Sequence, residues 1–147
     1  MARIELHFPE PVIFTTNIVV SVMDINYGNH LGNDRVLGYL HEARIRFFES
    51  LGYLESDIEG VSLIQADTAV VYQSEAFYNN QIQINIGLGD FSRAGFELYY
   101  QLYNITQQKN TALAKTGMVC FDYKERKVKS VPEKFKFACE KLKKPKA

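Results

Sequence analysis

A short polar segment holds three side chains that could accept a proton or orient a water molecule. Asp24, Asn26 and His30 carry a carboxylate, an amide and an imidazole. Such groups accept a proton or orient a water molecule. The stretch that contains them, DINYGNHLGN, is crowded with Asn, Asp and Gly, residues that supply turns and tolerate positive φ. The three side chains are therefore predicted to lie on a loop.

A long helix is predicted directly after this loop. Apolar residues recur there with the three-and-four spacing of one buried helical stripe. The stripe consists of Val36, Leu37, Leu40, Ala43, Phe47, Phe48 and Leu51. Asn33 can cap this helix, Asp34 places negative charge in its first turn, and Gly52 is a stop signal.

The amino-terminal end of this helix is the second half of the candidate site. Backbone N–H groups lack partners at such an end, and the helix dipole adds partial positive charge. Both suit a site where negative charge develops on a carbonyl oxygen. The amides concerned belong to Gly32 and Asn33, and Gly32 has no side chain to block a close approach.

The remaining chain predicts an antiparallel sheet. Residues 12–23 are dense in β-branched residues, and four further β-rich runs follow Gly60. These runs are SLIQADTAVVYQSEAFY, QIQINIGLG, FELYYQLYNIT and TALAKTGMVCFDY. Their connections are too short for crossover helices, so the strands should pair antiparallel. One long helix buries one stripe, which favours a sheet wrapped around it. A short amphipathic helix is predicted after Pro132.

The loop and helix resemble a known family. DINYGNHLGN followed by YLHEARIRFFESLG is similar to a segment of the hotdog-fold thioesterases related to 4-hydroxybenzoyl-CoA thioesterase, and of fatty-acyl thioesterases with the same fold. The matching positions are Asp24, Asn26, His30, Asn33 and the Glu-Ala-Arg run at 42–44. The resemblance implies one α+β hotdog domain over residues 1–147. Its antiparallel sheet, of about five to six strands, would wrap around one long central helix.

The resemblance also implies an activity and an assembly. The activity is hydrolysis of an acyl-CoA or acyl-carrier-protein thioester to the free acid and the thiol. The assembly is a homodimer or homotetramer with sites at the interface between paired subunits. Exposed sheet edges, which are usually covered by a partner, give a second reason to expect an oligomer. Coenzyme A would enter as part of the substrate, and no separate cofactor is expected.

One position departs from the family pattern. Many relatives carry an aspartate, as base or nucleophile, where this chain has Asn26, and an amide cannot do that work. Either Asp24 or His30 would then activate the water, with Asn26 helping to position it. An unperturbed imidazole pKa of about 6.5 suits such a role near neutral pH.

Two residues of the predicted helix need separate interpretation. Glu42 is a possible further site residue, because it falls nearly opposite the buried stripe and so faces solvent or a partner subunit. Arg44 falls within the stripe, and a buried guanidinium must be paired. A structural ion pair is therefore expected for Arg44.

Two rival functions stay open. The same pocket could hold an acyl group or acyl-CoA without cutting it, and the amide of Asn26 keeps this non-catalytic alternative in play. A lyase or dehydratase on the same fold is the third possibility.

Composition excludes several classes of function. Seventeen basic and seventeen acidic side chains give a formal net charge of zero, which disfavours nucleic acid as a partner. No apolar run approaches the roughly 20 residues that span a bilayer, so no membrane partner is expected. Two cysteines, Cys120 and Cys139, are few for a disulfide framework, which favours a cytoplasmic location. The three histidines are scattered, with no Cys/His cluster, so no metal site is expected.

Overall fold

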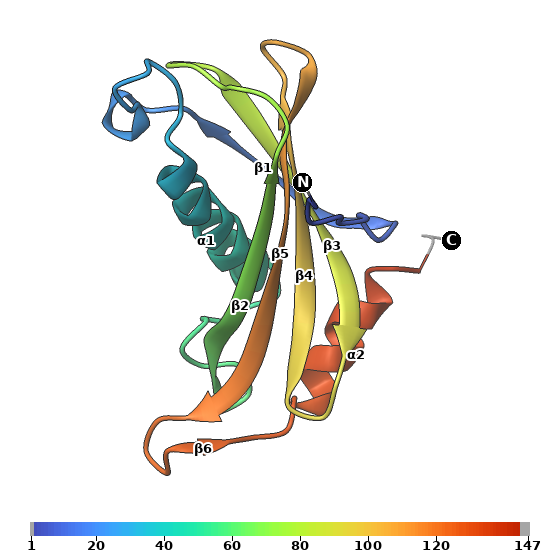
Figure 1. The fold of residues 1–147 in the computed structure, drawn as a ribbon. Coiled ribbons are helices and arrows are strands. Elements are labelled where there is room, and N and C mark those ends of the chain that lie inside the picture. Colours follow the sequence, from blue (N-terminus) through green and yellow to red (C-terminus); the bar gives the residue numbers. More distant parts are fainter. Residues whose placement is uncertain (1, 145–147) are drawn as a thin grey trace.

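The structure, a computed structural model, describes residues 2–144 and consists of one curved sheet with two helices (Figure 1). The strands are β1 (Val12–Val19), β2 (Ser62–Tyr72), β3 (Gln81–Phe91), β4 (Gly95–Asn104), β5 (Lys109–Asp122) and β6 (Lys127–Val128). The helices are α1 (Asn33–Ser50) and α2 (Glu133–Lys141), and a 3₁₀ turn spans Val22–Asp24.

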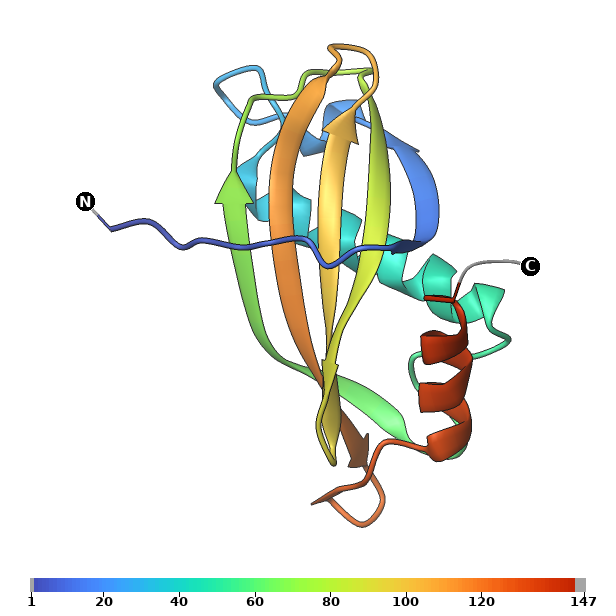
Figure 2. The ribbon, with the colours of Figure 1, turned by 90° about the vertical axis from the view of Figure 1, so that its right-hand side faces the viewer.

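All the strands pair antiparallel, in the order β1-β3-β4-β5-β2, with β6 on β5. Helix α1 lies across one face of the sheet, and α2 packs beside β3 (Figures 1 and 2). The predicted α+β hotdog fold is confirmed. The strand β6 was not foreseen, because two residues carry too little pattern to signal a strand.

Alternation along the strands produces the core. Even-numbered residues in 82–88 of β3 and 96–104 of β4, such as Ile84, Ile86 and Leu98, are buried, whereas the odd-numbered residues between them, Gly87 excepted, remain partly exposed. They share one hydrophobic cluster with Phe47 and Phe48 of α1. Burial of each such side chain contributes roughly 1.5–3 kcal/mol, so this layer supplies most of the force that holds α1 against the sheet.

The buried stripe of α1 follows the prediction except at Leu37. Val36, Leu40 and Ala43 are buried as expected, but the side chain of Leu37 is 46% exposed. The reason is geometric, because each residue turns the helix by about 100° and Leu37 lies one step beyond the contact line with the sheet. Tyr39, which was not assigned to the stripe, is buried instead.

Arg44 has the partner that the sequence required. Arg44 is 3% exposed, and its Nε donates to Glu55 Oε2 at 3.1 Å. A second guanidinium nitrogen donates to the hydroxyl of Tyr100 at 3.4 Å, and that hydroxyl lies 2.6 Å from Thr116 Oγ1. This polar network ties α1 to the loop before β2 and to the centre of the sheet.

The segment that precedes β1 crosses the face of the sheet opposite to α1 (Figure 2). Phe8 and Pro9 lie on β3 at Gly87, where an added Cβ would come within 2.7 Å of the Pro9 carbonyl oxygen and 2.8 Å of the Phe8 ring. Gly87 therefore permits this close approach. Within the described residues, no helix is both long enough and apolar enough to cross a bilayer.

We predict that both cysteine thiols are unreactive in the folded protein. Cys120 lies in β5 and Cys139 in α2, both fully buried. Burial raises the pKa of Cys120 to about 11 and, with Glu140 nearby, that of Cys139 to about 12. At pH 8 both therefore stay protonated, and the thiolate is the reactive form. A chromogenic disulfide reagent should react slowly with the thiols of the native protein. In denaturant it should react rapidly with both thiols. Fast labelling of the native protein would contradict this prediction.

Candidate active site

The loop before α1 is closed by its own backbone. The N–H of Gly32 donates to the carbonyl of Asp24 at 3.0 Å, and the N–H of Asn26 donates to the carbonyl of His30 at 2.9 Å. An isolated β-bridge joins Ile25 to Leu31 between these bonds. The loop is therefore a small closed ring whose end feeds directly into the helix.

Two details of the helix start differ from the prediction. Gly32, with an extended backbone, is the N-cap residue, and Asn33 is the first residue of α1, so Asn33 does not cap the helix. The Gly32 amide is also not bare, because the Asp24 carbonyl already accepts its hydrogen bond. Among the described residues, the amides of Asn33 and Asp34 have no acceptor. The donors open to a ligand thus lie one residue further along the chain than expected.

The side chain of Asn26 stabilises the loop by hydrogen bonds. Its Oδ1 accepts hydrogen bonds from the N–H of Gly28 at 2.9 Å and of His30 at 3.4 Å. Gly28 is tightly packed, since a Cβ there would lie 3.2 Å from His30 Nε2 and 3.3 Å from Asn26 Oδ1. The amide of Asn26 therefore holds the backbone that carries His30, which is the work of an Asx turn.

His30 is held with a defined tautomer. Its Nδ1 lies 3.1 Å from the carbonyl oxygen of Leu31, and a carbonyl can only accept, so Nδ1 carries the proton in this contact. Neutral His30 then has its lone pair on Nε2, which lies 4.0 Å from Glu75 Oε1. The side chain of His30 is 26% exposed, so water can reach it.

A cavity of about 250 Å³ joins His30 to the helix start. Asn33 of α1 lines it, together with Tyr72 at the end of β2 and Glu75 in the following loop. The Tyr72 hydroxyl donates to the Asn33 carbonyl at 3.0 Å, which fixes the end of β2 beside the first turn of α1. His30 and the Asn33 residue whose amide is free therefore share one cavity.

Asp24 faces a different cavity, of about 350 Å³. Its Oδ2 accepts a hydrogen bond from the hydroxyl of Tyr39 at 2.8 Å. Burial and this carboxylate raise the pKa of Tyr39, so the hydroxyl stays protonated and continues to donate. Within one chain the structure brings His30 and Asn33 together, but it does not bring Asp24 into their cavity.

Glu42 is exposed, as expected, and lines the cavity of Asp24. Its Oε2 accepts a hydrogen bond from Arg46 Nε at 3.0 Å. Arg46 also donates to Thr16 Oγ1 and to the Asn17 carbonyl of β1. Glu42 thus orients the arginine that links α1 to β1.

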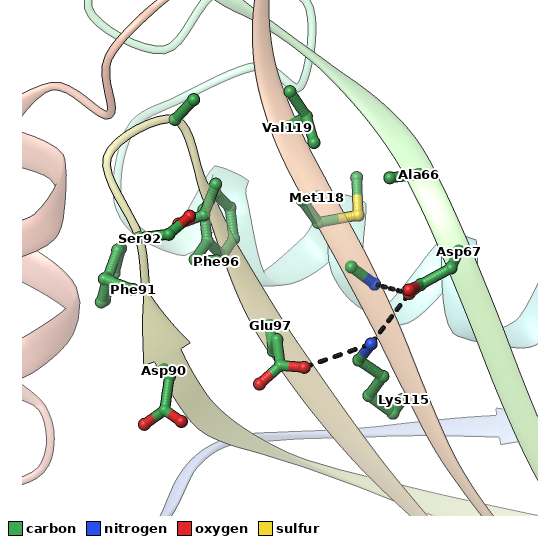
Figure 3. Close-up of a pocket in the computed structure, with 13 residues that line it drawn as sticks. Ala66, Asp67, Asp90, Phe91, Ser92, Phe96, Glu97, Lys115, Met118 and Val119 are labelled. Carbon is green, nitrogen blue, oxygen red and sulfur yellow. Dashed lines mark hydrogen bonds and ion pairs between the residues drawn. The ribbon is translucent and has the colours of Figure 1, made fainter.

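A third hollow, of about 360 Å³, shares no lining residue with these two cavities. Figure 3 shows its lining residues. Its ion network comes from the middle of the sheet: Lys115 Nζ lies 2.8 Å from Asp67 Oδ1 and 3.1 Å from Glu97 Oε2. Lys115 holds the pKa of Asp67 below its usual range. Because the lysine is bound by two carboxylates and no residue of the 24–33 loop reaches this hollow, the network reads as structural.

Sequence reasoning missed Tyr72, Glu75 and Thr111, which line the cavity of His30. Tyr72 ends β2, Glu75 lies in the loop that follows it, and Thr111 is the third residue of β5. Nothing in their local sequence points to His30, because only the folded sheet brings these segments to the start of α1.

Comparison with known proteins agrees with the family resemblance of the loop and helix, and it extends over most of the chain. The family model described as the thioesterase-like superfamily matches residues 20–138. No curated protein matches. A 1,4-dihydroxy-2-naphthoyl-CoA thioesterase from Synechocystis is 21% identical, with a TM-score of 0.81 over 90% of this chain and 98% of that one. A DHNA-CoA thioesterase from Staphylococcus aureus is 18% identical, with a TM-score of 0.75 over 86% of this chain and 85% of that one.

Proposed function

Because the chain belongs to the thioesterase-like superfamily, we propose that it hydrolyses an acyl-CoA thioester in the cavity between His30 and the start of α1. The observation that carries this proposal is the shared cavity itself. It is lined both by His30 and by Asn33, the first residue of α1, whose amide is free.

The first turn of α1 would polarise the thioester. Its carbonyl oxygen would accept from the free N–H groups of Asn33 and Asp34, where the helix dipole is positive. These donors are fixed by the helix, so they need no rearrangement when negative charge develops on the oxygen. Removal of one such donor typically slows a reaction by about 10²- to 10³-fold.

His30 would activate the water. Nε2 takes a proton as the water oxygen bonds to the thioester carbon, and Nδ1 stays bonded to the Leu31 carbonyl. When the C–S bond breaks, the imidazolium returns the proton to the thiolate, which leaves as the thiol together with the free acid. The carboxylate of Glu75, 4.0 Å away, would favour the transient positive charge.

Asn26 and Asp24 act in this scheme through the loop. Asn26 holds the amide of His30, and Asp24 holds the amide of Gly32 through its backbone carbonyl. Both are positioning residues. Asp24 remains the rival base, because its carboxylate lies next to the opposite side of the same helix end.

A panel of acyl-CoA and aryl-CoA esters, followed by detection of free thiol, tests the proposed activity. Purified protein should release coenzyme A from at least one member of the panel. The panel extends to acyl-carrier-protein esters, which decide between the two classes of donor. A protein that binds the esters without releasing thiol would be the non-catalytic binder instead, an alternative that Asn26 favours through its lack of a carboxylate.

We also propose that the protein is a homo-oligomer. Strands β1 and β2 form the two edges of the sheet, so each has one side with unpaired backbone groups. Exposed apolar side chains near the site, including Val22, Met23 and Tyr27, add a surface that a second copy could cover. Light scattering at micromolar concentration should give a mass of two or four chains. A mass of one chain would contradict this prediction.

A further inference from the structure

Thr111 breaks the alternation of β5. Its exposed fraction is 3% and that of its neighbour Ala112 is 0%, although successive side chains of a strand normally face opposite sides. Leu102 of β4 pairs with Ala112 whereas Tyr103 pairs with Asn110, so Thr111 is the extra residue of a β-bulge. A bulge redirects a side chain that a regular strand would place elsewhere.

The redirected hydroxyl has no partner. Among the described residues, no group forms a hydrogen bond with Thr111 Oγ1, although the atom is fully buried. The carbonyl of the same residue accepts from the N–H groups of Gln73 at 2.9 Å and Ser74 at 3.2 Å. A buried hydroxyl without a partner is unfavourable, so its place in the chain calls for a functional reason.

Thr111 lines the cavity that His30 and Asn33 share. The other buried residues that line it, Leu31, Val36 and Ala76, are apolar, so the hydroxyl is the one polar side-chain group among the buried lining residues that the structure describes. Rotation about the Cα–Cβ bond of threonine exchanges its hydroxyl and methyl groups. A ligand in the cavity can therefore be met by either group.

We propose that Thr111 is a substrate-binding residue that selects acyl groups with a hydroxyl or oxo substituent over plain alkyl chains. This inference rests on the proposed function. Asn33 is an exposed lining residue of the cavity and Thr111 is a buried one. A carbonyl bound at the Asn33 amide would then place the acyl group deeper in the same cavity, where Thr111 lies. A polar substituent there completes the missing hydrogen bond, whereas an alkyl chain leaves the hydroxyl unpaired.

The test compares matched pairs of straight-chain acyl-CoA esters, each with and without a hydroxyl on the second, third or fourth carbon. Wild type should favour at least one hydroxylated ester by about 10-fold or more in kcat/KM. Thr111→Val keeps the shape and removes the hydroxyl, so the preference should disappear. Thr111→Ser keeps a hydroxyl and should retain it. The Thr111→Val protein should melt no lower than wild type, because an unpaired buried group has been removed.

Two results would overturn this role. An equal fold loss of kcat/KM in Thr111→Val for both members of a pair would mean that the hydroxyl contacts the thioester itself, and unchanged kcat/KM values for both members would mean that Thr111 does not contact the substrate. If wild type cleaves none of the esters, the proposed function fails. The affinity for each intact ester is then measured by calorimetry. Wild type and Thr111→Ser should bind the hydroxylated member of a pair more tightly, and Thr111→Val should not.

Discussion

Replacement of His30 by alanine is expected to lower kcat/KM for acyl-CoA hydrolysis by about 10²- to 10⁴-fold, the usual contribution of a general base. The variant loses the imidazole that lines the cavity, but it keeps the free amides of Asn33 and Asp34. Some activity above the uncatalysed rate should therefore remain. Release of free thiol, measured across a range of substrate concentrations, gives kcat and KM separately.

The control for this variant is His7→Ala. His7 is exposed in the segment before β1 and lines neither of the cavities beside α1, so its loss should leave kcat/KM unchanged. Circular dichroism should show that both variants keep the native fold. Asp24→Asn tests the rival base, since its amide oxygen can still accept from Tyr39. A large loss in Asp24→Asn with little loss in His30→Ala would reverse the assignment.

The second large effect concerns stability. Glu55→Ala should lower the free energy of unfolding by about 3 kcal/mol, because it leaves the buried charge of Arg44 without its carboxylate. This value is at the low end of the usual range, since 19% of the Glu55 side chain remains exposed. Unfolding in urea, followed by fluorescence or circular dichroism, gives the free energy from the midpoint and slope.

Glu42→Ala provides the matched control for Glu55→Ala. It breaks the exposed pair with Arg46 on the same helix and should lower the free energy of unfolding by less than about 1 kcal/mol. Adding Arg44→Met to Glu55→Ala should restore part of the loss, because the unpaired charge is then absent. Equal losses from Glu42→Ala and Glu55→Ala would show that the buried network does not hold α1 to the sheet.

Within the candidate site, the sequence located the loop and the helix start but not the cavity that each side chain lines. The DINYGNHLGN motif located the loop, and His30 does lie beside the helix start. The sequence offered Asp24 and His30 as alternative bases beside one helix end, and the structure directs the Asp24 side chain toward Tyr39 in a second cavity. Spacing along a loop does not fix which side of a helix end each side chain reaches.

The sequence by itself determined the local elements and one long-range requirement. Periods of about 3.6 and 2 residues encode which face of α1 and of each strand meets the core, because they depend only on neighbours within a few turns. Because Arg44 lies inside the apolar stripe, its charge required a partner. The sequence did not show that this partner is Glu55.

Tertiary structure alone decided which groups are free to meet a substrate. The Asp24 carbonyl takes the Gly32 amide, which moves the open donors to Asn33 and Asp34. The bulge of β5 turns Thr111 into the cavity of His30, and the loop after β2 brings Glu75 to the same place. Such contacts join residues far apart in the chain, so they depend on strand register and sheet curvature, which no local pattern specifies.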